Sequence, residues 1–583
     1  MSFENTYQTE SANTQPFLSR RQKRQIEWIM IILLICGYAA VTLAQTPTPT
    51  TGLNDLNYSA ESVFQPTIKD AVKLSDVPEI KDSVRRISNI KYGITSIPVF
   101  AKYEAQPIEV AKLQNEPLQK LYHSLLKLGY SPYYNMPYGE LWLGSSRSKD
   151  MNYSAHLKHF SSTTHLKDVG YGGFSDNQVN VFGKRFYKKH TLNGDLNYER
   201  NVVHYYGYDT TLNHLSKDYT KQRYQLFEPK IQVMSHYTDS THINHNIQLS
   251  YYNLKNLYRE TENNVKLNAH GSTFINKEKL NVGFLTDYYN HRQANDTASD
   301  LIMSLSPSFE AAGKKWHANV GVTGTLDNFK KVSKFYFYPQ LNLDYDIYES
   351  IIIPYAGVSG GLIKNSMRTL SRENPFIDTT INYRNTSNKY SLFGGLRGNL
   401  SSSTSYDAKV NYAQYEDLHF FVIDYRGANL IYNQFYVLYD DASVLTLTGQ
   451  LKYQMKEKLS FIGKGNYYIY KPKNLTRAYH KPDFDLTFSA IYNLQSKIII
   501  RGDLFFMGKQ WALTQMEEGG VTSYTPKQIN GWADINLEGE YRYSKMLSFF
   551  VRFNNIASQR YYRWERYPSQ RFSFMLGLTF VPF

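Results

Sequence analysis

The stretch WADINLEGEYRYS, residues 532–544, separates its side chains into two kinds when it is read as an extended strand. One face is apolar or small, with Ile535, Leu537, Gly539, Tyr541 and Tyr543. The opposite face is polar or charged, with Asp534, Asn536, Glu538, Glu540 and Arg542. Five such side chains have no place in a dry core, but they can line a water-filled barrel whose other face meets lipid. The stretch therefore predicts a strand of a transmembrane β-barrel.

The same division recurs in LNLDYDI, residues 341–347, and in LTLTGQLKYQ, residues 445–454. Alternation of this kind is weak evidence in any one segment, but here it continues from about Leu118 to the end of the chain. Composition agrees, because the mean hydropathy is only −0.49 while 15% of the residues are aromatic and 51 are tyrosine. A soluble, tyrosine-rich all-β protein would share this composition, so the repeated alternation is the stronger evidence.

Short turns alternate along the chain with longer loops. Nine tight turns are predicted, at residues 147–150, 188–190, 276–279, 312–315, 348–350, 401–403, 455–457, 494–497 and 544–545. Longer loops are predicted near 207–221, 293–299, 365–388, 417–442, 472–481, 508–528 and 559–570. Outer-membrane barrels place short turns in the periplasm and long loops outside. Counted back from a terminal strand that descends to the periplasm, with 417–442 as one loop, the pattern predicts an all-β antiparallel barrel of about 22 strands. The first two strands are expected near 118–130 and 138–146.

The N-terminus has the order of a secretory leader. Four basic residues between Arg20 and Arg24 precede the apolar run WIMIILLICGYAAVTLA, which ends at Ala44. We therefore expect a signal peptide with a long n-region at 1–45 and the barrel at 118–583. The intervening segment, 46–117, is interrupted by prolines and is expected to be irregular, and either periplasmic or folded into the lumen. The single cysteine, Cys36, lies in the leader, so the mature chain is expected to have no disulfide.

The end of the chain, INLEGEYRYSKMLSFFVRFNNIASQRYYRWERYPSQRFSFMLGLTF, resembles the barrel of TonB-dependent receptors of Gram-negative outer membranes. A strand that reaches the step Asn554-Asn555-Ile556, an aromatic loop and an apolar last strand are typical of that family. The segments YGELWLGSSRSKD (138–150) and VVHYYGYD (202–209) are similar to barrel segments of a plug-poor branch. The resemblance covers roughly residues 118–583 and implies localisation in the outer membrane.

The chain departs from this family before the barrel. Family members carry a large N-terminal plug and a TonB-contacting segment, whereas residues 46–117 are too few for that plug and contain no convincing TonB-contacting segment. We therefore expect a receptor-like barrel that lacks a full plug and is not energised by TonB on its own. A lumen this wide needs filling, by residues 53–116, by inward-folded loops such as 417–442, or by a partner protein.

The last strand, in RFSFMLGLTFVPF (571–583), is the expected signal for the barrel-assembly machinery. Its candidate signal residues are Phe572, Phe574, Leu576, Leu578, Phe580 and Phe583. Phe583 is out of phase with Phe580, and Pro582 interrupts the alternation, so the strand is expected to end near Phe580. Deleting Phe583 should then impair assembly less than replacing Phe580.

Three segments are candidates for extracellular docking, and the third is the long loop RTLSRENPFIDTTINYRNTSN (368–388). The aromatic loop RYYRWERYP (560–568) contributes Tyr561, Tyr562, Arg563, Trp564 and Tyr567, and the apolar segment HFFVIDYRGANLIYNQFYVLYDD (419–441) contributes Phe420 and Phe421. For the aromatic loop, an outer aromatic girdle with arginines that bind lipopolysaccharide is the favoured interpretation. The second segment is too apolar to stand free in water, so it is expected to pack against something.

The sequence offers no chemistry of an enzyme. It lacks a glycine-rich phosphate loop, a zinc-spaced Cys/His set and a nucleophile elbow, so no catalytic, cofactor or metal site is expected. His156 and His159 fall on opposite faces of a strand, and Arg501 and Asp503 are expected to form an ion pair in the lumen. The net charge of +14 comes from scattered basic residues, which favours lipid, lipopolysaccharide or an anionic partner over nucleic acid.

Two functions follow as hypotheses. In the first, the barrel is a transport or receptor protein for a bulky solute, gated by its N-terminal segment or by a partner such as a surface lipoprotein. In the second, it is a non-transporting scaffold subunit of an outer-membrane complex that assembles or exports surface proteins.

Overall fold

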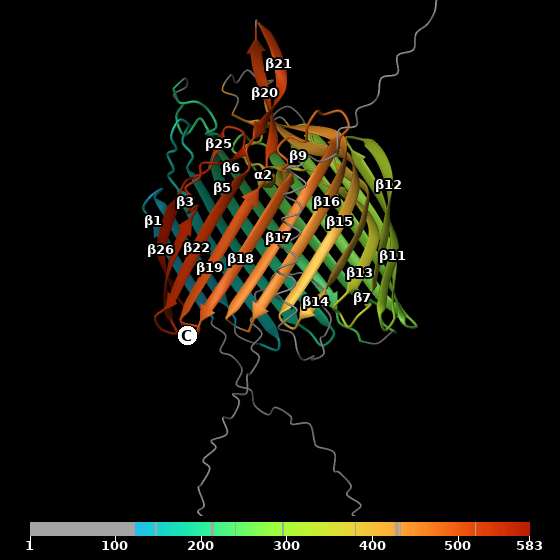
Figure 1. Cartoon of the computed structure of the whole chain (residues 1–583). Coiled ribbons are helices and arrows are strands. Elements are labelled where there is room, and N and C mark those ends of the chain that lie inside the picture. The colour runs from blue at the N-terminus through green and yellow to red at the C-terminus, as the bar shows by residue number, and fades with distance from the viewer. Residues whose placement is uncertain are drawn as a thin grey trace, which may run out of the picture. The chain divides into compact units, whose positions relative to one another are not determined.

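The computed structural model describes residues 123–582, except 146–147, 212–214, 239–240, 294–296, 379–380, 426–430, 432, 457 and 519. Within this part, 22 strands form one antiparallel sheet (Figure 1). The sheet closes into a barrel, because β1 (Ser124–Ser131) pairs with β2 (Met136–Gly144) on one side and with β26 (Ser573–Phe580) on the other. The prediction of an all-β barrel of about 22 strands is confirmed.

The other barrel strands follow in chain order, and each pairs with its neighbours. They are β3 (Met151–Ser162), β4 (Phe174–Phe186), β5 (His190–His204), β6 (Lys221–Ser235), β7 (Asn244–Lys255), β8 (Thr261–Ile275), β9 (Glu278–Arg292), β10 (Thr297–Ala312), β11 (Trp316–Phe329), β12 (Val332–Tyr345), β13 (Ile353–Ile363), β14 (Thr386–Ser401), β15 (Thr404–Ile423), β16 (Phe435–Met455), β17 (Leu459–Pro472), β18 (Phe484–Leu494), β19 (Ile498–Met507), β22 (Trp532–Arg542) and β23 (Leu547–Asn554). The expected signal peptide, the segment 46–117 and residues 118–122 lie outside the described residues.

Alternation along the strands separates a lipid-facing surface from the lumen, as the pattern of residues 532–544 predicts. In β22, Leu537 and Tyr541 are exposed on the outside, while Glu538 binds Lys127 of β1 and Arg552 of β23 inside. Exposed large apolar side chains recur on the outer faces of most strands, which is the surface that lipid requires. The helices among the described residues are all too short or too polar to span a membrane.

The terminal strand has the predicted faces and the predicted end. Leu576 is 56% exposed on the outside, whereas Met575 is 2% exposed and packs inside on Phe550 and Met136. Strand β26 ends at Phe580, as expected from the phase of the sequence. The assembly role of this strand is untested, and Phe583 lies outside the described residues.

The two ends of the barrel differ in their connections. All nine predicted tight turns fall between consecutive strands, at the end where Figure 1 marks the C-terminus. Longer connections lie at the other end, which we call the outer rim. There, the connection 508–531 contains the hairpin of β20 (Gln510–Glu518) and β21 (Val521–Ile529), and 555–572 contains β24 (Tyr562–Trp564) and β25 (Tyr567–Pro568).

The segment 417–442 is less of a loop than the sequence suggests. Strands β15 and β16 stay paired up to Ile423 and Phe435, so only 424–434 connects them. A bulge between Tyr415 and Leu418 shifts the register below this extension. The apolar run 420–423 continues the ladder because its side chains find a packed environment at the rim.

Candidate functional site

The connection between β13 and β14, residues 364–385, folds back into the barrel, and we call it the lid. It contains a short helix, α2 (Met367–Glu373). Ser366 caps the helix in a reciprocal pair with Thr369, and its apolar residues Met367 and Leu370 are spaced to share one face. Both side chains are buried in a cluster formed with lumen-facing residues of the wall. The lid is thus part of the core at the outer end of the barrel.

The helix α2 lies at the outer end of the barrel (Figure 1), and the lid contacts strands that are far apart in the ring. Arg372 binds Glu199 of β5 through two contacts of 3.0 Å. The next residue, Glu373, contacts the imidazole Nε2 of His419 of β15 at 2.7 Å. Arg372 and Glu373 are adjacent, so this short stretch of the lid joins β5 to the end of β15 beyond its bulge, although the two strands are ten apart in the ring of 22. The lid therefore obstructs the outer mouth.

Arg368 attaches the lid to β6, β7 and β8. Its guanidinium donates two hydrogen bonds to the Glu228 carboxylate, of 2.9 and 2.7 Å, and its Cζ lies 4.5 Å from the centre of the Tyr252 ring. The backbone N–H of Met367 donates to Glu262 at 2.7 Å. A bidentate pair of this kind fixes orientation as well as charge. The start of α2 is therefore held by two buried carboxylates.

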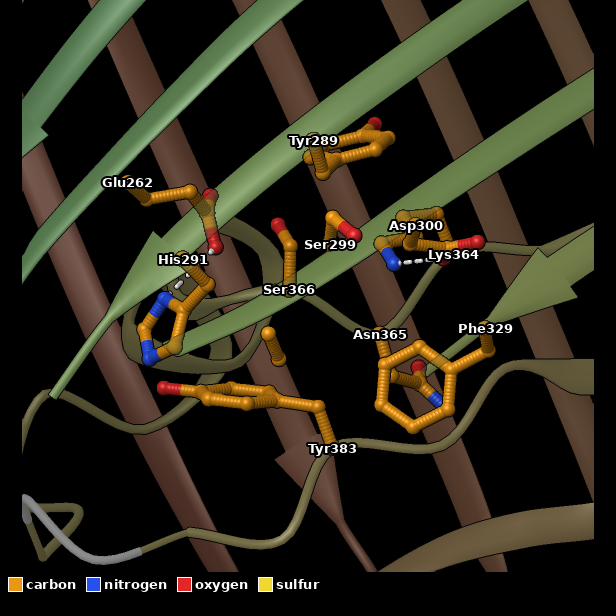
Figure 2. A pocket seen from close by; sticks show the side chains of 11 residues that line it. Glu262, Tyr289, His291, Ser299, Asp300, Phe329, Lys364, Asn365, Ser366 and Tyr383 are labelled. Atoms are coloured by element: carbon orange, nitrogen blue, oxygen red, sulfur yellow. Dashed lines mark hydrogen bonds and ion pairs between the residues drawn. The ribbon is translucent and has the colours of Figure 1, made fainter. Parts of the chain in front are cut away.

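Lys364 attaches the lid to β9, β10 and β11. Its ammonium pairs with Asp300 and lies 4.4 Å from the centre of the Tyr289 ring (Figure 2). The amide of Asn385, at the other end of the lid, donates to Asp300 at 2.9 Å and to Asp327 at 3.0 Å. Both ends of the lid therefore meet the same pair of carboxylates.

A small pocket remains between the lid and this wall. Figure 2 shows its polar lining, with the carboxylate of Glu262 next to the imidazole of His291, and Ser366 and Lys364 contributed by the lid. The full lining is Glu262, Tyr289, His291, Ala298, Ser299, Asp300, Phe329, Lys364, Asn365, Ser366 and Tyr383.

Glu373 attaches the far side of the lid. Besides His419, it accepts a hydrogen bond of 2.8 Å from Lys481 in the connection 473–483. Burial raises the pKa of the Glu373 carboxyl, but the hydrogen bond from His419 and the charge of Lys481 outweigh burial and lower the pKa to about 2. The carboxylate therefore stays ionised near neutral pH.

Apolar and aromatic residues of the lid, of β16 and of the connection 555–572 pack together at the outer mouth. Lid residues Ile377 and Ile381 share one buried cluster with Phe435, Trp564 and Tyr567. The rings of Phe435 and Trp564 lie 5.6 Å apart, and the Tyr567 hydroxyl donates to the carbonyl of Asn433. The lid backbone also pairs with Phe435, whose N–H donates to the Phe376 carbonyl at 2.9 Å.

The seven candidate docking residues are mostly buried, and their docking role stays untested. Phe420 and Phe421 are fully buried, and Trp564 and Tyr567 are only 6% and 3% exposed. Phe421, Trp564 and Tyr567 share one cluster with lid residues, whereas Phe420 packs with Val422, Ala442 and Tyr479. Tyr561 and Tyr562 are half-buried, and of the seven candidate docking residues only Arg563 is exposed. The expectation that 419–441 packs against something is confirmed for its described residues.

The remaining expectations concern single pairs in the wall. Arg501 and Asp503 form an ion pair of 3.2 Å, as expected. His156 contacts Glu140 at 2.9 Å, whereas His159 contacts Asn177, so the two histidines face opposite ways. In the part of the chain that the structure describes, no three His, Cys, Asp or Glu side chains gather as a metal site.

Most of the lid falls in 368–388, which was expected to be a long loop that docks a partner, but its fold into the lumen was not predicted. A signal was present, because Lys364, Arg368 and Arg372 recur every four residues and would share one helix face. The same spacing also fits a solvated helix, so it does not by itself reveal the partners.

No protein-family model matches the chain, and no curated protein sequence matches it. Solved structures do resemble it. The ferripyoverdine receptor of the outer membrane of Pseudomonas aeruginosa, bound to ferripyoverdine, is 10% identical with a TM-score of 0.60, covering 79% of this chain and 71% of the receptor. The siderophore receptor PirA from Acinetobacter baumannii is 9% identical with a TM-score of 0.60, covering 80% and 81%. A variant of the ferric enterobactin receptor PfeA from Pseudomonas aeruginosa, in complex with enterobactin, is 13% identical with a TM-score of 0.57, covering 78% and 81%. At these identities the likeness establishes the fold, which is the barrel of outer-membrane siderophore receptors.

Proposed function

We propose that this protein is an outer-membrane receptor or pore for a bulky solute, and that the lid is the gate of its outer mouth. The observation that carries the proposal is the span of the lid between β5 and β15, since a solute entering from outside must displace it. The lid is held by discrete ion pairs and aromatic contacts, so it has a defined closed position from which it can be released. We further propose that TonB does not energise the barrel directly and that the N-terminal segment or a partner assists opening.

The fold supports a receptor over a simple pore. The solved structures that resemble this chain are receptors for iron-bearing siderophores, as their names state. A barrel of this size needs an internal obstruction to keep the membrane sealed, and the lid supplies one at the outer end. Residues 46–117 would add a second obstruction if they fold into the lumen.

Conductance in planar bilayers tests the gate. A cysteine pair, Ile377→Cys with Phe435→Cys, would cross-link the lid to β16, because these two residues are bridge partners. We expect the oxidised variant to stay closed and the same variant, once reduced, to conduct at least as often as the wild type. A barrel that lacks residues 46–117 and whose residues 365–384 are replaced by a short Gly/Ser linker should conduct continuously. A closed lid-deleted barrel would contradict the proposal.

The hairpin β20–β21 favours a second candidate function, a scaffold subunit. This hairpin stands above the outer rim (Figure 1), and Met516, Val521 and Tyr524 are exposed on it. A surface lipoprotein or another complex subunit could bind there. Gentle detergent extraction followed by mass spectrometry would test this function, because a scaffold retains stoichiometric partners. A monomer that extracts alone and conducts after lid deletion would contradict it.

A further inference from the structure

The wall that receives the lid is lined with carboxylates. Of the seven strands from β5 to β11, five contribute a carboxylate that contacts the lid. We call these five carboxylates the acidic arc: Glu199, Glu228, Glu262, Asp300 and Asp327. The last four are at most 6% exposed. Buried carboxylates repel one another and lose hydration, so a wall of this kind is stable only with cations against it. In the closed state the lid supplies cations to Glu199, Glu228 and Asp300, while the wall itself adds Lys230 beside Glu228 and His291 beside Glu262.

Two of the lid cations lie in sites built from a carboxylate and an aromatic ring. Arg368 binds Glu228 and lies over Tyr252, while Lys364 binds Asp300 and lies over Tyr289. An acid paired with the face of a ring is the combination that proteins use to bind guanidinium and ammonium groups. The wall thus has the chemistry of a receptor for cations, whichever molecule carries them.

Some polar atoms of this wall have no hydrogen-bond partner in the lid. One carboxylate oxygen of Asp300, Oδ1, has no hydrogen-bond partner, although the residue is only 1% exposed. The buried His291 has no hydrogen bond on Nε2, its Nδ1 lies 3.6 Å from Glu262 beyond hydrogen-bond distance, and both His291 and Asp300 line the pocket next to the lid (Figure 2). A buried acceptor without a donor costs free energy. A ligand with more donors than the single ammonium of Lys364 would satisfy the site better than the lid does.

We propose that the acidic arc is the binding site for a solute that carries at least two guanidinium or ammonium groups, with Lys364, Arg368 and Arg372 occupying it as a tethered ligand in the closed state. The inference rests on the proposed function, since it assigns the solute class of the same gate. Solute and lid compete for the same carboxylates, so the solute binds only the state in which the lid has left the arc. Binding and opening are therefore coupled.

Binding of labelled tri-arginine to the purified full chain in detergent tests the inference. Wild type should bind weakly, because the lid occupies the arc. The variant Arg368→Gln/Arg372→Gln should bind about tenfold more tightly, within the usual range for coupled sites. Adding Glu199→Gln and Glu228→Gln to that variant should abolish saturable binding. The matched control adds Glu538→Gln instead, which removes a lumen carboxylate bound by Lys127 and Arg552 far from the arc, and should leave the affinity unchanged.

Two further probes define the chemistry. Spermidine should compete with tri-arginine if ammonium groups suffice, and tri-aspartate should not compete. Each variant is first checked for a heat-modifiable barrel band, and the milder Lys364→Gln variant provides a second route if the double variant does not fold. Absence of saturable binding in every folded lid variant would overturn the inference, and so would an equal loss of binding in the Glu538→Gln control.

The two proposals fail separately. If lid variants conduct but bind no cation, the gate stands and the solute class is wrong. If they bind tri-arginine at the arc but the lid-deleted barrel does not conduct, the site stands and the gated-pore function is wrong.

Discussion

The lid and the hairpin β20–β21 are two long connections of the same rim with opposite fates. The lid folds into the lumen, where both of its ends and its helix are bound to the wall. The hairpin instead satisfies its backbone by pairing with itself, from Gln510 with Ile529 to Glu518 with Val521, and most of its outer half is exposed. The two connections differ in the charge of the side chains that they can place against the lumen wall.

The lid combines three regularly spaced cations with apolar residues, and the lumen wall opposite it is acidic and aromatic. The hairpin also has apolar residues, but its charged residues are Glu517, Glu518 and Lys527, so it offers such a wall no excess of positive charge. Complementary charge and burial therefore decide which connection closes the barrel. Each prediction below tests that contrast.

Reversing the charge at the centre of the lid should have the largest effect. In Arg368→Glu, a third carboxylate faces Glu228 and Glu262, and breaking a buried pair of this kind costs about 3–5 kcal/mol. We expect the lid to leave the lumen, so that trypsin cleaves within 364–385 of the folded barrel. Arg501→Glu is the matched control, because it reverses a lumen charge in a mostly exposed pair away from the lid. Protection equal to wild type in Arg368→Glu would show that charge does not hold the lid.

Removing the central ring of the rim cluster should come next. Phe435 is fully buried and contacts His480, Trp564 and Tyr567. Phe435→Ala should destabilise the closed rim by about 3–5 kcal/mol. Hydrogen exchange should therefore accelerate in α2 and around Trp564, while the strands below stay protected by their continuous ladder. Phe549→Ala, on the lipid-facing surface, is the control and should leave exchange at the rim unchanged.

The contacts of Arg368 and of the rim cluster around Phe435 could not be predicted from the sequence. The strand number, the two faces and the tight turns were predictable because period-two alternation is local and repeats in every strand. The lid contacts are not local: Arg368 and Glu228 are 140 residues apart, and neither residue type specifies the other. Likewise, the sequence around Trp564 shows an aromatic loop but not its direction, because the turn between β24 and β25 places that ring inward. Burial of such residues depends on the closed ring of strands, which brings distant connections together.

Acid should weaken the closure to a smaller extent, and His480 should act first. Its Nδ1 contacts the Phe421 carbonyl at 2.7 Å, and its Nε2 accepts from the backbone N–H of Glu565 at 3.3 Å, an arrangement that fits a neutral ring. Burial lowers the pKa of His480 from 6.5 to about 4, against the opposing effect of the Phe421 carbonyl. Because the folded pKa is the lower one, the stabilisation is complete above pH 6.5 and is lost as the pH falls through 4.

Glu373 also loses its stabilising contribution on acidification, but at lower pH. The loss falls between the ordinary pKa of its carboxyl, 4.5, and its folded pKa of about 2. Release of the lid, measured by hydrogen exchange in α2, should therefore increase in two steps on acidification. His480→Gln, which can still donate and accept, should remove the step between pH 6.5 and 4 and keep the lower one. An unchanged upper step would assign it to another group.

Truncating the hairpin tip should have the smallest effect, which makes it the sharpest test of the contrast with the lid. The base of the hairpin is anchored, since Trp511 forms a bridge with Tyr479 and Lys527 binds Glu565 at 2.8 Å. The described residues of the tip, 516–524, make few such contacts, and most of their side chains are exposed. Removing them should change the stability of the closed rim by no more than about 0.5 kcal/mol. Replacing 516–524 by a two-residue Asn-Gly turn should leave conductance, trypsin protection of the lid and hydrogen exchange at wild-type levels. If the truncated barrel opened, the hairpin would share in closure, and complementarity to the acidic wall would no longer suffice to explain which connection seals the lumen.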